Sequence, residues 1–128
     1  QTKGIHNMTT LNLSTVTLND YTVEDLKTIK AAALQHANDA ATASIEARGE
    51  LGYCGFAWVN IYGIKGNTKL GKRMKAAGFD KDYTGAYSIW NPSGLGTQCM
   101  YTKEQGAEAC AAVFKAAGFT AYAGSRAD

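Results

Sequence analysis

The chain has 128 residues and a formal net charge of +2, and 45% of its residues are hydrophobic. This content, with a single proline, excludes a disordered chain, and the length predicts one domain. No apolar run approaches the roughly 20 residues that cross a bilayer. Three cysteines without CxxC spacing and two histidines exclude a disulfide framework or a zinc finger. We therefore expect a cytoplasmic protein with no membrane partner, metal or cofactor.

The first eight residues, QTKGIHNM, carry no periodic pattern, and we interpret residues 1–8 as a leader or a remnant of processing. Residues 9–128 are expected to form a single α+β domain. Its first element is predicted over 9–20, where TTLNLSTVTLND alternates apolar and polar residues with one change of phase. That pattern indicates a strand with a bulge, or two short strands.

A long Ala-rich helix is predicted next, ending at about Arg48. Thr22 and Asp25 have the spacing of a capping box, in which a hydroxyl and a carboxylate each accept from a main-chain amide. Small and apolar residues then recur every three or four positions, which is typical of a buried helix face. Gly49 is typical of a helix end.

The remaining elements alternate between strands and helices. Aromatic and β-branched stretches predict strands over 53–62, 86–91, 97–101 and 119–125. Helices are predicted over 68–77 and, after a second capping box at Thr102 and Gln105, up to residue 118. Both of these helices end in the sequence KAAGF, with glycine at the left-handed cap.

From residue 53 this order is β-α-β-β-α-β, which predicts a ferredoxin-like core with both helices on one face of the sheet. The fold class is therefore α+β, with the core preceded by an N-terminal strand and the long Ala-rich helix. Those two elements should cover the other face or mediate association. Because a small open sheet leaves edges and an apolar face, we expect a homo-oligomer.

Catalysis has little support in the sequence. His36 lies in the middle of the long helix, where a solvent-facing residue is the simpler interpretation, and Glu104 and Glu108 lie opposite an apolar helix stripe. No phosphate-binding loop, dinucleotide fingerprint or metalloprotease motif is present. We therefore predict no catalytic residues and favour a binding protein over an enzyme.

The stretch GIKGNTKLGKRMKAAGF, residues 63–79, contains five cations and no carboxylate. Its glycines and Asn67 precede a helix, and main-chain amides at a helix start attract anions. Lys69 and Arg73 lie four residues apart and could add donors. Two interpretations stay open here, an anion cradle and a solvated basic helix face.

Two further segments offer ligand-binding groups. In WNPSGLGTQ, residues 90–98, Trp90 could stack on a base while the amides of Asn91 and Gln98 read its edges. Near the C-terminus, Arg126 offers a bidentate donor for phosphate, and Asp128 could accept from hydroxyl groups. The alternatives are an anchoring tryptophan with ordinary turn chemistry, and a frayed tail.

The succession CGFAWV, GNTKLGK, WNPSG…TQ, KEQGAEA and AYAGSRAD, within residues 53–128, resembles a group of small bacteriophage-encoded proteins. To a lesser degree it is similar to the anti-Thoeris sponge proteins. That resemblance implies binding of cyclic ADP-ribose-type signals or cyclic oligonucleotides without degradation, in the cytoplasm of the host. It also implies ligand contacts at Trp90, at Asn91 or Gln98, and at Arg126.

We therefore expect a non-enzymatic protein that sequesters a phosphorylated nucleotide-type signalling molecule and so acts in phage counter-defence. Three alternatives remain open. The chain could be a protein-binding inhibitor of a host enzyme, a single-stranded nucleic-acid-binding protein, or an oligomeric enzyme acting on a nucleotide or sulfonium metabolite. A small phosphorylated ligand and further copies of the chain are the expected partners, and nucleic acid is less favoured.

Overall fold

The computed structural model describes residues 17–50 and 52–128, which form an α+β fold. The elements follow in the order η1 (Leu18–Asp20), α2 (Val23–Arg48), β1 (Gly55–Tyr62), α3 (Lys69–Ala76), β2 (Tyr87–Trp90), α4 (Met100–Ala116) and β3 (Thr120–Ala127). None of these described helices is both long and apolar enough to cross a membrane.

The long helix α2 begins and ends where the sequence predicts. The Thr22 hydroxyl accepts from the Asp25 amide at 3.0 Å, and the Thr22 amide donates to the Asp25 carboxylate at 2.9 Å. This capping box satisfies amides that otherwise lack partners at the start of a helix. At the other end Gly49, at φ 72°, donates to the Ile45 carbonyl. Both predicted signals are confirmed.

The sheet that the structure describes has three strands in the order β2-β1-β3, with β1 antiparallel to both neighbours. β2 and β3 therefore run in the same direction on either side of β1, and α4 connects them. The register places Trp58 of β1 beside Trp90 of β2 and Gly124 of β3. Residues far apart in the sequence thus become neighbours on one face.

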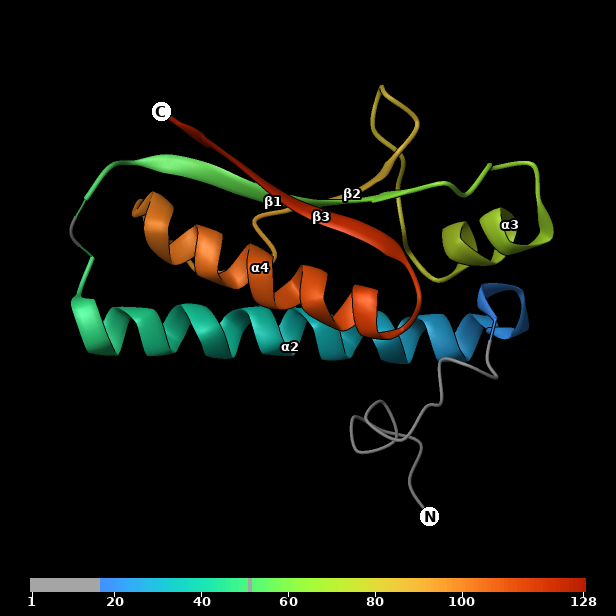
Figure 1. The fold of residues 1–128 in the computed structure, drawn as a ribbon, viewed down its shortest axis with the longest axis horizontal. Coiled ribbons are helices and arrows are strands. Elements are labelled where there is room, and N and C mark those ends of the chain that lie inside the picture. Colours follow the sequence, from blue (N-terminus) through green and yellow to red (C-terminus); the bar gives the residue numbers. More distant parts are fainter. Residues whose placement is uncertain (1–16, 51) are drawn as a thin grey trace, which may run out of the picture.

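The helices lie on one side of this sheet. Figure 1 shows α4 against the sheet and α2 beyond α4, so the molecule has a sheet layer followed by two helix layers. Of the two expected roles of the long helix, covering the opposite face is therefore wrong, whereas a role in association stays a prediction. The reason lies in the small residues at the α2–α4 contact, where Ala37, Ala41 and Gly106 allow close approach. A Cβ atom at Gly106 would lie 3.2 Å from the Ala37 carbonyl oxygen.

The prediction of a strand over 97–101 is wrong. Cys99 forms only an isolated antiparallel bridge with Cys54, and Met100 and Tyr101 already belong to α4. The helix begins after Cys99, so the expected capping box at Thr102 and Gln105 lies inside it. With three strands in the described part of the chain, the full ferredoxin-like core is not confirmed.

The predicted N-terminal strand lies mostly outside the described residues, because the structure describes the chain from Thr17. Residues 18–20 form a 3₁₀ turn instead of extended chain. Thr17 and Asp20 close this turn through a hydroxyl–carboxylate hydrogen bond of 3.0 Å. Tyr21, which follows, is buried, and its hydroxyl donates to the Ala117 carbonyl at 2.7 Å.

The two KAAGF segments end α3 and α4 in the same way, as predicted. Gly78 and Gly118 have φ angles of 95° and 99°. In each segment the phenylalanine amide donates to the carbonyl five residues earlier, which is the hydrogen bond of a Schellman motif. Phe79 and Phe119 then both pack edge-on against Phe114, with ring centroids 5.8 Å apart. The two helix ends therefore meet in the hydrophobic core.

Candidate functional site

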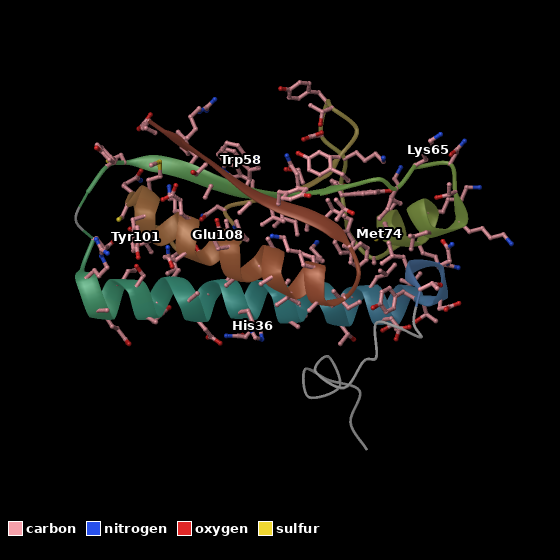
Figure 2. All side chains as sticks on the ribbon, viewed as in Figure 1. His36, Trp58, Lys65, Met74, Tyr101 and Glu108 are labelled. Carbon is pink, nitrogen blue, oxygen red and sulfur yellow. The ribbon has the colours of Figure 1, made fainter. Side chains whose placement is uncertain are left out.

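The face of the sheet that points away from α4 carries aromatic side chains. Alternate residues of β1 are buried against α4, which leaves Phe56, Trp58, Asn60 and Tyr62 on the outer face. Figure 2 shows the Trp58 side chain on this side, with Tyr101, Glu108 and His36 on the helices. No described helix covers this face, so its aromatic residues remain accessible to a ligand.

Two tryptophans form the centre of the outer face. The indole rings of Trp58 and Trp90 are parallel within 2°, with centroids 5.6 Å apart. Gly124 makes room for this arrangement, because a Cβ atom there would lie 2.5 Å from Trp58 Nε1. Trp90 remains 58% exposed. An exposed indole held in place by a second one is a surface on which a flat ring can stack.

A cation lies next to this aromatic pair. Arg126 of β3 is the register partner of Phe56, and its guanidinium carbon is 5.6 Å from the Phe56 ring centroid. Phe56 in turn lies 5.5 Å from Trp90, centroid to centroid. The outer face therefore carries a continuous series of guanidinium and aromatic groups, drawn from three strands.

A groove of about 330 Å³ opens over this surface. The lining residues come from all three strands and from the loop before β2, and they are Trp58, Asn60, Asp82, Tyr83, Thr84, Ser88, Trp90 and Arg126. The volume falls within the range of small-molecule sites, roughly 300–1,000 Å³. Its walls combine aromatic faces with amide, hydroxyl and charged groups.

The loop before β2 is shaped by Asp82. The Asp82 carboxylate accepts from the Thr84 hydroxyl at 2.6 Å and from the amides of Thr84 and Ala86. The hydrogen bond from the Thr84 hydroxyl is the largest cause that lowers the pKa of Asp82; desolvation opposes it, and the amides of this loop add to the lowering, so that the pKa lies below its ordinary value. Asp82 is therefore a carboxylate at neutral pH, and Arg126 is the one cation among the groove's described lining residues. A phosphate group fits the Arg126 side of the groove better than the loop side.

The structure brings Trp90 and Arg126 into one groove, but Asn91, Gln98 and Asp128 do not line it. The Asn91 amide is used within its own turn, donating to the Leu95 carbonyl and accepting from the Ser93 hydroxyl. Gln98 is exposed, and its main-chain carbonyl accepts from the Gly55 amide.

The C-terminal residue Asp128 is exposed, and its amide donates to the Cys54 carbonyl at 3.0 Å. That hydrogen bond continues the β1–β3 pairing beyond Ala127. The end of the described chain is therefore tied to the sheet by its main chain. Arg126, two residues earlier, extends from a paired strand position.

The predicted basic segment forms α3 and the loop before it, apart from the groove. Asn67 and Lys69 are exposed, and the Thr68 hydroxyl caps the helix by accepting from the Gly71 amide at 3.0 Å. The Arg73 guanidinium donates to the Asn19 carbonyl at 2.7 Å and so joins α3 to η1. The Gly71 amide at the helix start and the Arg73 guanidinium, both expected to bind an anion, therefore form hydrogen bonds within the protein.

The side chains considered for catalysis lie on helices. His36 is exposed on α2, which agrees with the solvent-facing interpretation. Glu104 accepts from the Ser125 hydroxyl at 2.5 Å, and Glu108 lies beside it in a hollow of about 70 Å³. In the described part of the chain, no three His, Cys, Asp or Glu side chains come together as a metal-binding group.

Sequence reasoning missed most of the groove, namely Trp58, Asn60, Asp82, Tyr83, Thr84 and Ser88. The alternation Phe56, Trp58, Asn60, Tyr62 was the available signal, because it places three aromatic residues on one face of a strand. The chain matches no protein-family model, no curated protein and no solved structure.

Proposed function

We propose that the protein binds a small phosphorylated ligand that carries a nucleobase, in the groove on the outer face of the sheet, and does not convert it. The stacked pair of Trp58 and Trp90 carries this proposal, because an open aromatic surface beside a guanidinium group suits a base joined to a phosphate. In this proposal the base stacks on Trp90. Arg126 pairs with the phosphate.

The proposed role is sequestration of a nucleotide-type signal in the cytoplasm, with cyclic ADP-ribose and cyclic oligonucleotides as the ligand classes that the resemblance suggests. The counter-defence role rests on that resemblance alone. The groove supports the binding step, since its lining residues offer stacking and charge. The recovered ligand distinguishes binding from catalysis: mass spectrometry should find it intact after incubation, whereas a converted product would favour the enzyme alternative.

A second candidate, binding of single-stranded nucleic acid, has its own observation. The aromatic surface continues beyond the groove, where Tyr62 and Tyr122 lie 6.1 Å apart, and the Lys115 amine lies 5.4 Å from the Tyr122 ring. Successive bases could stack along such a row. The volume of the groove favours a single nucleotide over a polymer.

The test of the proposed function compares AMP with adenosine, and parent protein with Arg126→Ala. We expect the parent to bind AMP more tightly than adenosine, because a hydrogen bond to a charged group contributes about 1.5–3 kcal/mol. Arg126→Ala should weaken AMP binding about tenfold and leave adenosine binding unchanged. Quenching of tryptophan fluorescence, or calorimetry, measures the affinities for AMP and adenosine. Cyclic ADP-ribose and a cyclic dinucleotide are titrated in the same way.

The matched control is Lys72→Ala, which removes the same charge from an exposed position on α3 outside the groove. It should bind AMP like the parent. A loss with Lys72→Ala equal to that with Arg126→Ala would show a general charge effect and contradict the phosphate contact. A short oligonucleotide whose affinity exceeds that of AMP and falls steeply with salt would support the second candidate instead.

We also propose that the chain is a homo-oligomer. β2 and β3 are the two edges of the described sheet, and β3 offers eight residues of edge strand, Thr120–Ala127. Exposed edges favour pairing with another chain, and such pairing leaves the outer face available to a ligand. Light scattering at micromolar concentration should give the mass of a dimer or larger assembly. A monomer mass would contradict it.

A further inference from the structure

Cys54 and Cys99 are cross-strand neighbours, although they are 45 positions apart in the sequence. The Gly55 amide donates to the Gln98 carbonyl at 3.1 Å, and the Met100 amide donates to the Tyr53 carbonyl at 2.8 Å. Hydrogen bonds on both sides of a residue pair define a non-hydrogen-bonded antiparallel position, where the Cα atoms are about 4.5 Å apart. That separation falls inside the range of about 4.4–6.8 Å found in disulfides.

The two cysteines have different surroundings. Cys54 is exposed immediately before β1, whereas Cys99 is buried at the N-cap of α4. Cys54 is therefore the thiol of this pair that a reagent in solution can reach. Burial opposes ionisation of Cys99, but hydrogen bonding, chiefly from the Thr102 amide and also from the Tyr101 amide, outweighs it, so the pKa of the Cys99 thiol lies below its ordinary value. A thiol at a helix N-terminus is stabilised as thiolate in the same way.

We propose that Cys54 and Cys99 are an oxidation site that forms a reversible intramolecular disulfide. With glutathione disulfide as oxidant, the Cys54 thiolate attacks one sulfur and releases one glutathione thiolate, which leaves Cys54 in a mixed disulfide. The Cys99 thiolate then attacks the Cys54 sulfur and releases the second glutathione. The two cysteines lose two protons and two electrons, and glutathione disulfide is reduced to two glutathione molecules.

Cys110 supplies an internal control. Its side chain is fully buried on α4, and burial raises the pKa of its thiol to about 12. It is therefore neither accessible nor ionised at neutral pH, and it should stay a thiol in the folded protein. Tryptic cleavage separates the three cysteines into peptides 49–65, 82–103 and 104–115, so each possible link gives a different product.

The experiment treats the folded, reduced protein with glutathione disulfide and then blocks free thiols before digestion. We expect an intact mass lower by two hydrogen atoms before blocking, and a cross-link between peptides 49–65 and 82–103. Cys99→Ser should retain one glutathione on Cys54, because no resolving thiol is present. Cys54→Ser should remain unmodified.

Three results would overturn the proposal. The first is a parent protein that keeps all three thiols, and the second is one that accumulates stable glutathione on Cys54. The third is a cross-link that includes Cys110 or joins two chains. The peptide map of the parent protein identifies which cysteines are linked, and its denatured intact mass shows whether the link lies within one chain, so the proposal stays testable even if Cys99→Ser fails to fold. Dithiothreitol should restore the original mass.

Discussion

Replacing Trp58 and Trp90 together by alanine should weaken AMP binding at least a hundredfold. Base–aromatic stacking contributes about 1–3 kcal/mol per aromatic side chain, and each 1.4 kcal/mol is a tenfold change in affinity. Trp90→Ala alone should cost about tenfold, because Trp58 still offers an aromatic face 5.6 Å away. The double replacement removes the whole stacking surface. Calorimetry measures these affinities, since the double variant has no tryptophan left to report binding by fluorescence.

The matched control is Tyr53→Ala, because Tyr53 is 76% exposed and does not line the groove. It should bind AMP like the parent, and its circular dichroism should be unchanged. Circular dichroism of the double variant should also be unchanged, since both indoles lie on the outer face. AMP binding that survives in a folded double variant would rule out the sheet face as the site.

The fold could be predicted wherever local chemistry decides it. The capping box of Thr22 and Asp25, the glycine after α2 and the KAAGF helix ends all act within a few residues, and all are confirmed. The start of α4 could not be predicted in this way. Thr97–Tyr101 is rich in residues that favour strands, and a cysteine N-cap is a weak signal. Tertiary contacts override that preference, including a hydrogen bond from the buried Lys103 amine to the Gly55 carbonyl at 2.8 Å.

The candidate site could be predicted only in part for a related reason. Trp90 and Arg126 meet because β2 and β3 lie on either side of β1, and strand order depends on contacts between distant residues. Trp58 is accessible only because the helices lie on the other face of β1. The sequence did not show which face of the sheet they would cover. The sequence pattern shows that α2 has a stripe of small residues, but it does not show that this stripe packs against α4.

Within the basic segment of residues 63–79, Gly71 lies against the loop before α3, and its replacement tests that close contact. Gly71 lies in α3, where alanine usually stabilises a helix by about 1 kcal/mol relative to glycine. A Cβ atom at Gly71, however, would overlap the Lys65 carbonyl oxygen and lie 2.9 Å from Gly66 Cα. We therefore expect Gly71→Ala to lower the free energy of unfolding by about 1–3 kcal/mol, the usual cost of overpacking.

The loop cannot easily move away from such a methyl group. The Lys65 carbonyl accepts from the Thr68 hydroxyl at 2.6 Å, and the Thr68 hydroxyl accepts from the Gly71 amide. On the other side, the buried Tyr87 hydroxyl donates to the Gly71 carbonyl at 3.2 Å. A shift of either segment would break hydrogen bonds that hold α3 to the loop and to β2.

Urea unfolding of Gly71→Ala measures this effect, with Gly96→Ala as the control for the glycine-to-alanine change. A Cβ atom at Gly96 would meet nothing within 4 Å beyond its own chain neighbours, so this replacement should leave the unfolding midpoint unchanged or slightly higher. A Gly71→Ala protein as stable as the parent would contradict the close approach of Lys65 to α3.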